Sequence, residues 1–124
     1  MPDLFADSYA LVAFLEGNDR YVRIFQSKTL VTTALNVLEV YGTLLRRIDR
    51  REARELASGF LPIAVSAPAE ASLAAAEFRH SMRARKKDCS YVDAWGYSVA
   101  HQLSIRFLTG DHAFRHVENV EFVR

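Results

Sequence analysis

Short apolar runs alternate along this chain with longer segments whose apolar side chains recur every three to four positions. The short runs are rich in aliphatic and aromatic residues and are bounded by polar residues, glycine or proline, which predicts strands. The longer segments have the spacing of helices that bury one face. Strands are predicted at residues 3–6, 30–32, 63–65, 105–108 and 120–123. This alternation of strands with helices or helix pairs predicts a three-layer α/β/α fold with a mostly parallel sheet of about five strands.

Capping residues mark where the predicted helices begin. Asn18, Thr33 and Ser90 each precede a segment of helical spacing, and their side-chain oxygens can accept a backbone N–H of the first turn. Asp49 followed by Glu52 has the spacing of a capping box. Helices are therefore predicted at about 9–15, 19–26, 34–48, 50–59, 68–83 and 91–103.

Size and composition fit one domain over residues 1–124. Half of the 124 residues are hydrophobic, which is enough for one core. The single cysteine, Cys89, excludes an intramolecular disulfide and suits a reducing compartment. The sequence has no basic and apolar leader, and no apolar run approaches the roughly 20 residues that span a bilayer. We therefore expect a soluble, cytoplasmic protein that does not bind membranes.

Four carboxylates stand at positions unlike those of ordinary surface acids. Asp7 ends the first predicted strand, and Asp111 follows the predicted strand at 105–108. Asp93 lies in the first turn of a helix, and Glu39 interrupts the apolar face of another. In open α/β sheets, ligand sites lie outside the carboxyl ends of the strands. The predicted fold therefore brings these acids towards one edge of the sheet.

Each acid also has a purely structural interpretation. Asp7 can cap a helix, Asp93 can interact with a helix dipole, and Asp111 can be a turn residue after a glycine. Glu39 is harder to explain in this way, because a partly buried glutamate needs a partner.

Four ionised carboxylates in one cleft require a cation. Each close pair repels by about 1 to 4 kcal/mol unless protons are shared or positive charge is added. Ligand sets made only of oxygen favour Mg²⁺ or Mn²⁺, and such ions keep positions open for water and phosphate oxygens. The acids therefore predict a metal-dependent site that cleaves phosphodiester bonds.

At these residues the sequence resembles the PIN-domain ribonucleases, and most closely the VapC-type toxins of toxin–antitoxin pairs. The resemblance covers nearly the whole chain, and the order and spacing of its motifs are more specific than any one motif. The matching segments are Asp7-Ser8, Asn36-Val37-Leu38-Glu39-Val40, Tyr91-Val92-Asp93-Ala94, and Thr109-Gly110-Asp111 with Phe114.

The resemblance implies a single PIN-like domain that acts as a metal-dependent endoribonuclease. It assigns Asp7, Glu39, Asp93 and Asp111 to catalysis and to the binding of Mg²⁺ or Mn²⁺. It also implies an RNA substrate, a homodimer and a cognate antitoxin that inhibits the toxin. Many relatives carry a further acid two residues beyond Asp111, where this chain has alanine, so one metal ion or two remains open. Supporting roles at the site are implied for Ser8 and Thr109.

Basic residues form two clusters that the net charge of +1 conceals. The first runs from Arg46 to Arg54, and its interpretation as a solvated helix face paired with nearby acids is favoured over RNA binding. The second contains Arg79 and Arg83 and ends in Arg85, Lys86 and Lys87. Because this cluster precedes Asp93 closely, Arg85, Lys86 and Lys87 are candidates for binding RNA phosphates.

Two other functions compete with the nuclease interpretation. A phosphoacceptor receiver domain has similar length, but it needs paired acids after the first strand and a lysine after the last, and this chain has neither. A catalytically silent PIN-like module that binds RNA or a protein partner is the stronger alternative.

Overall fold

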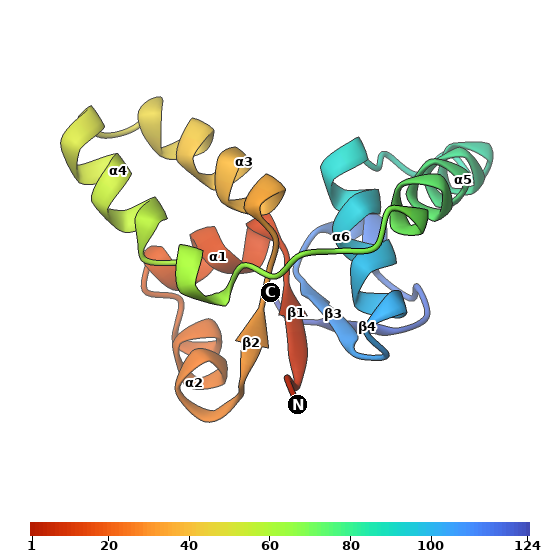
Figure 1. The fold of residues 1–124 in the computed structure, drawn as a ribbon, viewed down its shortest axis with the longest axis horizontal. Helices are drawn as coiled ribbons and strands as arrows, with labels where there is room; N and C mark the ends of the chain where they lie inside the picture. Colours follow the sequence, from red (N-terminus) through yellow and green to blue (C-terminus); the bar gives the residue numbers. More distant parts are fainter.

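The computed structural model describes residues 1–124, with a four-stranded parallel sheet at its centre (Figure 1). The strands are β1 (Leu4–Ala6), β2 (Leu30–Val31), β3 (Arg106–Thr109) and β4 (Val120–Phe122). They lie in the order β2-β1-β3-β4, and every neighbouring pair is parallel. The carboxyl ends of β1 and β3 therefore lie side by side.

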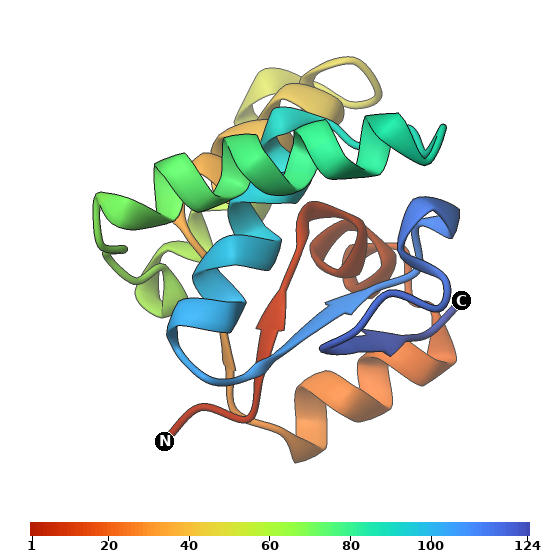
Figure 2. The same cartoon turned by 90° about the vertical axis from the view of Figure 1, so that its right-hand side faces the viewer.

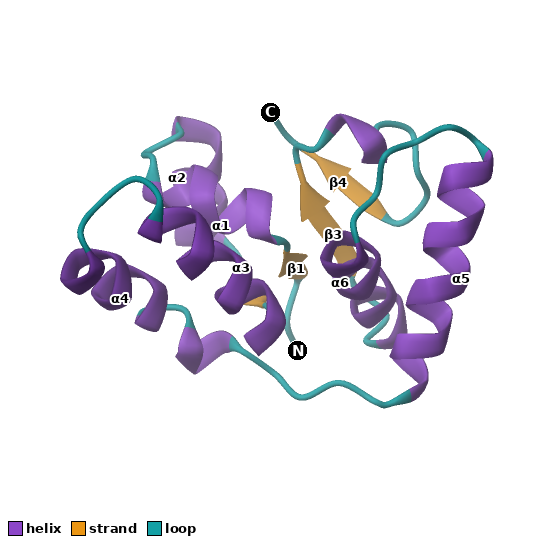
Figure 3. Ribbon diagram, turned by 90° about the horizontal axis from the view of Figure 1, so that it is seen from above, coloured by secondary structure: helices purple, strands orange, loops and turns teal.

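Helices cover both faces of this sheet, which confirms the predicted three-layer arrangement (Figures 2 and 3). No helix is both long enough and apolar enough to cross a membrane. The helices are α1 (Ser8–Leu15), α2 (Asp19–Ser27), α3 (Ala34–Leu45), α4 (Arg50–Ser58), α5 (Glu70–Ala84) and α6 (Tyr91–Gln102), with short 3₁₀ turns at Leu61–Ile63 and His112–Phe114.

Two hydrophobic cores form because alternate residues of β1 point to opposite faces. Leu4 and Ala6 belong to a core shared with residues of helices α1 to α4. Phe5 belongs to a second core shared with α5 and α6, where its ring stacks on Phe107 of β3 at a centroid distance of 5.9 Å. The sheet is thus covered by α1 to α4 on one face and by α5 and α6 on the other.

The predicted strand at 63–65 is wrong. Leu61–Ile63 forms a 3₁₀ turn, and only one parallel bridge joins Thr32 to Ala64. Pro62 in that turn has no backbone N–H and a fixed φ, so it favours the turn over a strand start. Two backbone hydrogen bonds to this edge remain, one from Thr32 N to Ile63 O at 3.0 Å and one from Val65 N to Thr32 O at 2.8 Å. The sheet therefore has four strands instead of five.

The predicted helix starts at Asn18, Thr33, Asp49 and Ser90 are confirmed, because each side chain accepts a first-turn N–H. Two predicted boundaries shift. The helix predicted to reach residue 48 ends at Leu45, and the alanine-rich helix begins at Glu70 instead of near Pro68.

Helix α6 lies unusually close to the sheet at Gly96. A Cβ atom at this position would lie 2.9 Å from Cε1 of Phe5 and 3.0 Å from Cε1 of Phe107. Neither ring can retreat far, because both side chains are fully buried. The absence of a side chain at Gly96 therefore sets how closely the helix carrying Asp93 packs against the strands.

We expect Gly96→Ala to lower the free energy of unfolding by about 1 to 3 kcal/mol through overpacking. Gly42→Ala is the matched control, because a Cβ atom on this glycine of α3 would meet nothing within 4 Å. The free energy of unfolding of Gly42→Ala should rise by up to about 1 kcal/mol, since alanine has a higher helix propensity than glycine. Urea unfolding of both variants measures the difference, and equal effects would contradict the close approach.

Candidate acidic site

Two of the four acids follow neighbouring strands and cap the elements that come next. Asp7 follows β1 directly, and its Oδ1 accepts the N–H of Ala10 at 2.9 Å at the start of α1. Asp111 lies two residues beyond β3, and its Oδ1 accepts the N–H of Ala113 at 3.0 Å. Because β1 and β3 are adjacent and parallel, both carboxylates lie at the same edge of the sheet.

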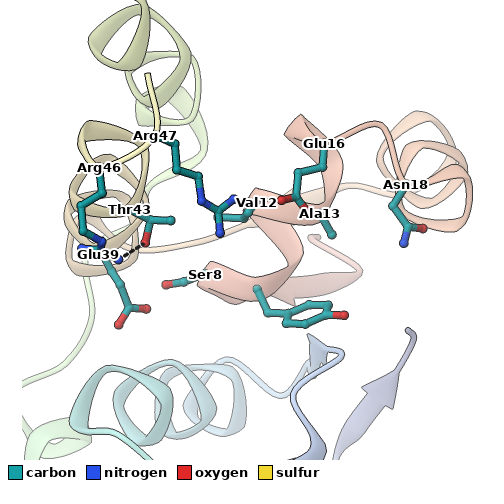
Figure 4. A pocket seen from close by; sticks show the side chains of 10 residues that line it. Ser8, Val12, Ala13, Glu16, Asn18, Glu39, Thr43, Arg46 and Arg47 are labelled. Carbon is teal, nitrogen blue, oxygen red and sulfur yellow. Dashed lines mark hydrogen bonds and ion pairs between the residues drawn. The ribbon is translucent and has the colours of Figure 1, made fainter. Parts of the chain in front are cut away.

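The other two acids come from helices on opposite sides of the sheet. Asp93 is held by a capping box at the start of α6: its Oδ2 accepts the N–H of Ser90, and the Ser90 hydroxyl accepts the N–H of Asp93, each at 3.1 Å. Glu39 is half-buried on α3, where its carboxylate points away from the neighbouring Arg46 and Arg47 (Figure 4). The capping role expected for Asp7 is therefore real, and Asp93, expected to interact with the helix dipole, also forms a capping box with Ser90.

Burial gives Asp7 the most perturbed carboxyl group of the set. Its side chain is 1% exposed, and burial raises its pKa to about 8. Hydrogen bonds from Thr109 and Ala10 oppose this rise, while the charges of Asp93 and Asp111 add to it. A carboxyl group that is costly to ionise and has no basic partner is typical of a functional site.

The charges of the other acids also act on Asp93. Burial is the largest cause of its raised pKa; the hydrogen bonds of Ser90 lower the pKa, and the charges of Asp111 and Glu39 raise it further. None of the four acids takes part in a salt bridge, since the three in the structure join other residues. The four carboxyl groups are therefore electrostatically coupled, Glu39 through Asp93, and none of them forms an ion pair with a basic side chain.

The carboxylates do not converge into a closed ligand set. No three or more histidine, cysteine, aspartate or glutamate side chains are arranged so that they could hold a metal ion together. The donor chemistry still fits Mg²⁺ or Mn²⁺, because these ions prefer carboxylate oxygens and keep several water ligands. Water can therefore complete a ligand shell that these side chains leave open.

Two surface cavities open beside the acids. One of about 450 Å³ is lined by Asp93 and Asp111 together with Lys86, Lys87 and His112. The other, of about 570 Å³, is lined by residues of α1 and α3, among them Glu39 (Figure 4). Its lining residues are Ser8, Tyr9, Val12, Ala13, Glu16, Asn18, Glu39, Thr43, Arg46 and Arg47.

A largely buried polar network joins helices α1, α3 and α6. Asn36 Nδ2 donates to the Ser8 hydroxyl at 3.2 Å, and the Thr33 hydroxyl donates to Asn36 Oδ1 at 2.7 Å. Trp95 Nε1 donates to Thr33 Oγ1 at 3.2 Å, which brings α6 into the network. Sequence reasoning identified Thr33 as a cap and missed the role of Asn36. The signal available was a hydrogen-bonding residue three positions after a threonine cap.

Ser8 and Thr109 occupy different places relative to the acids. Thr109 is fully buried, its hydroxyl hydrogen-bonds Asp7, and its Oγ1 accepts the N–H of Asp111 at 3.1 Å. It therefore contacts two of the four acidic residues. The Ser8 hydroxyl instead accepts a hydrogen bond from the Asn36 amide, so Ser8 belongs to the polar network of Asn36 and Thr33.

The basic residues divide between the site and the free surface. Lys86 and Lys87 line the cavity with Asp93 and Asp111, whereas Arg85 is exposed at the end of α5 and does not line it. Lys86 has a φ of 59°, the left-handed conformation that ends many helices.

In the first cluster, Arg47 pairs with Glu16 at 2.9 Å and Arg51 with Glu55 at 3.6 Å. The pair within α4 agrees with the expected solvated helix face. Arg47 instead lies in the turn after α3 and pairs with an acid at the end of α1, so the cluster does not form one helical stripe.

Comparison with known families agrees with this geometry. The sequence profile of the family described as PIN domain matches residues 4–120. No curated protein sequence matches the chain.

Several solved structures share the fold. The chain is similar to the sarcin–ricin loop cleaving toxin VapC20 of Mycobacterium tuberculosis, with a TM-score of 0.78 and 22% identity over 96% of this chain and 98% of that chain. It is similar to DNA-bound VapBC from Salmonella typhimurium, with a TM-score of 0.76 and 9% identity over 99% and 98% of the two chains. It is also similar to VapBC2 from Rickettsia felis bound to a DNA fragment from the promoter, with a TM-score of 0.74 and 13% identity over 97% of this chain and 96% of that chain.

We expect Asn36→Ala to lower the free energy of unfolding by about 2 to 3 kcal/mol. The change removes the amide that donates to the buried Ser8 hydroxyl and the oxygen that accepts the Thr33 hydroxyl proton, and unsatisfied buried groups are costly. Gln102→Ala, at the exposed end of α6, is the control. Urea unfolding followed by the fluorescence of Trp95 measures both variants, and a loss no larger than that of the control would contradict the network's role.

We expect Asp7→Asn to stabilise the metal-free protein, and increasingly so at higher pH. In the wild type the folded state binds the Asp7 proton more tightly than the unfolded chain, whose carboxyl pKa is 3.8. Wild-type stability therefore falls as pH rises from about 4 to about 8, by on the order of a few kcal/mol. Asparagine keeps an oxygen that can cap α1 and does not ionise.

The difference in Tm between Asp7→Asn and the wild type, measured in a chelator, should grow up to pH of about 8 and then level off. A difference that does not change with pH would show that the Asp7 charge is not held in a buried environment.

Proposed function

Because the chain belongs to the PIN-domain family, we propose that residues 1–124 form a single PIN-like domain that acts as a metal-dependent endoribonuclease, the toxin of a toxin–antitoxin pair. The observation that carries the proposal is a group of coupled carboxyl groups near the carboxyl edge of the sheet, none of which takes part in a salt bridge. Asp7, Asp93 and Asp111 act on one another electrostatically, and Glu39 acts on Asp93. A solvated surface patch would not bury Asp7 among like charges.

We propose that Asp7, Glu39, Asp93 and Asp111 hold Mg²⁺ or Mn²⁺. When bound, such an ion lowers the pKa of a water molecule and stabilises negative charge on phosphate oxygens. The ion also offsets the burial of Asp7, because positive charge nearby favours the ionised carboxylate. One ion is the simpler expectation, since alanine stands at position 113 where many relatives have an acid.

The chain's own side chains would bind and orient the RNA. Lys86 and Lys87 line the same cavity as Asp93 and Asp111, so their ammonium groups can bind phosphates that flank the cleaved bond. Asp7 and Asp93 are fixed by backbone hydrogen bonds, whereas Glu39 accepts none and is half-buried. Glu39 therefore has the freedom to orient an attacking water by accepting its proton in a hydrogen bond.

We propose that the protein assembles as a homodimer and that a cognate antitoxin inhibits it. Support for the antitoxin comes from the similar structures, which include VapBC from Salmonella typhimurium and from Rickettsia felis. The homodimer rests on the family resemblance alone. Light scattering at tens of micromolar tests it, and a monomeric mass would contradict it.

A catalytically silent PIN-like module that binds RNA or a protein partner is the second candidate. One observation favours it: no three potential ligands are arranged to hold an ion. The two candidates differ in cleavage and agree in RNA binding, so a cleavage assay separates them.

We expect Asp93→Asn to reduce metal-dependent cleavage of a mixed structured RNA pool by about 100-fold or more, because the ion's effect on the transition state amounts to several kcal/mol. Asparagine keeps an oxygen for the N–H of Ser90, so the capping box can persist. Cleavage is measured on denaturing gels with Mg²⁺ or Mn²⁺ and with a chelator.

Asp19→Asn is the matched control, since Asp19 is an exposed acid at the start of α2 with no side-chain partner in the structure. It should leave cleavage unchanged, and the Tm of both variants should stay near that of the wild type. Equal activity of Asp93→Asn and the wild type would contradict the nuclease and reveal a contaminating enzyme.

A further inference from the structure

Tyr91 is an aromatic side chain that the fold leaves on the surface next to the acidic site. It is 68% exposed, although it is the first residue of α6 and the core side of that helix is well packed. No other aromatic ring stacks on it. Its hydroxyl has no hydrogen-bond partner, so neither packing nor a polar contact explains a tyrosine here.

The ring is nevertheless held by a contact. The Arg79 guanidinium lies over it, with Cζ 4.1 Å from the ring centroid. Arg79 is itself fixed, because its Nε donates to the backbone carbonyl of Cys89 at 2.8 Å. A half-buried arginine anchored to the backbone therefore supports one face of the ring and leaves the rest open.

The surroundings of the ring are basic. A surface cavity of about 470 Å³ is lined by Tyr91 and by Arg79, His80 and Arg83 of α5, with Ala76 and Ala84. No carboxylate lines this cavity, and none of its arginines takes part in a salt bridge. An aromatic face beside unpaired arginines is the combination that single-stranded nucleic acids bind, through base stacking and phosphate contacts.

This cavity lies next to the acidic one along the chain. The loop from residue 85 to residue 90 leads from the end of α5 to the start of α6 (Figure 3). Lys86, Lys87 and Ser90 from this loop line the acidic cavity, and Tyr91 directly after it lines the basic one. A single-stranded nucleic acid bound across this loop would place phosphates at both cavities.

We infer that Tyr91, held by Arg79, is a stacking platform for one unpaired RNA base beside the bond that the acids cleave, with Arg83 contacting a flanking phosphate. The inference rests on the proposed function for its substrate class and adds a positioning residue for single-stranded RNA. The platform reads no base identity, because every base offers a π-face.

The test measures binding of a short fluorescent RNA of mixed sequence by anisotropy, with Ca²⁺ in place of Mg²⁺ to suppress cleavage. We expect Tyr91→Ala to weaken binding about 5- to 100-fold and Tyr91→Phe to keep it within about twofold, because stacking needs the ring and not the hydroxyl. Leu73→Ala removes a comparably exposed apolar side chain from α5 and should have no effect.

Two further measurements distinguish a loss of base stacking from a loss of charge and from misfolding of the variant. The negative slope of log affinity against log salt should be unchanged in Tyr91→Ala and shallower by about 0.7 in Arg83→Gln, since only the latter removes a phosphate contact. On an oligonucleotide with abasic sites throughout, Tyr91→Ala and the wild type should bind equally. Unchanged affinity of Tyr91→Ala for normal RNA, or an equal loss on abasic RNA, would overturn the inference and point to a protein partner for this surface.

Failure of the inference can be distinguished from failure of the nuclease proposal. If the wild type cleaves RNA and Tyr91→Ala binds as tightly as the wild type, only the platform is wrong. If the wild type binds with the expected dependence on Tyr91 and cleaves nothing, only the nuclease is wrong. If the wild type binds no RNA, both are wrong.

Discussion

The burial of the Asp7 carboxylate at the end of the central strand β1 is the constraint on which the rest of the site depends. Removing this group from water raises its pKa to about 8, so the folded chain bears an electrostatic cost there. The fold limits that cost with hydrogen bonds from Thr109 and from the first turn of α1. It also places other acids nearby, which increases the cost. In the proposed function these nearby charges would attract a cation, and the bound cation would offset the cost.

The polar network of Ser8, Thr33, Asn36 and Trp95 explains how such a site can be rigid between two hydrophobic cores. One core lies under α1 to α4 and the other under α5 and α6. Hydrogen bonds connect α1, α3 and α6. Gly96 then sets the distance between α6 and the sheet. The acids of the two sides are thereby held in one neighbourhood.

Basic side chains lie beside the acids at the end of α5. Lys86 and Lys87 line the cavity of Asp93 and Asp111, and Arg79 and Arg83 line the next cavity with Tyr91. An anionic strand would be attracted by these basic side chains and positioned over the carboxylates, where a cation offsets the repulsion. The left-handed turn at Lys86 directs this basic loop back across the end of α5. In the proposed function, the basic side chains that would bind the strand and the carboxylate of Asp93 come from one loop and from α5 and α6.

The sequence by itself determined the features that depend on local interactions: four confirmed helix caps, four of the five predicted strands, and the order of the acidic motifs. These follow from spacing and side-chain type within a few residues. The predicted strand at 63–65 failed because Pro62 favours a turn and only Ala64 reaches the sheet edge. Tertiary structure alone decided the strand order β2-β1-β3-β4, the complete burial of Asp7 and the contacts of Asn36 with Ser8 and of Arg79 with Tyr91. These contacts join residues far apart in the chain or set an exact burial, and both depend on how helices pack on the sheet, which no local pattern encodes.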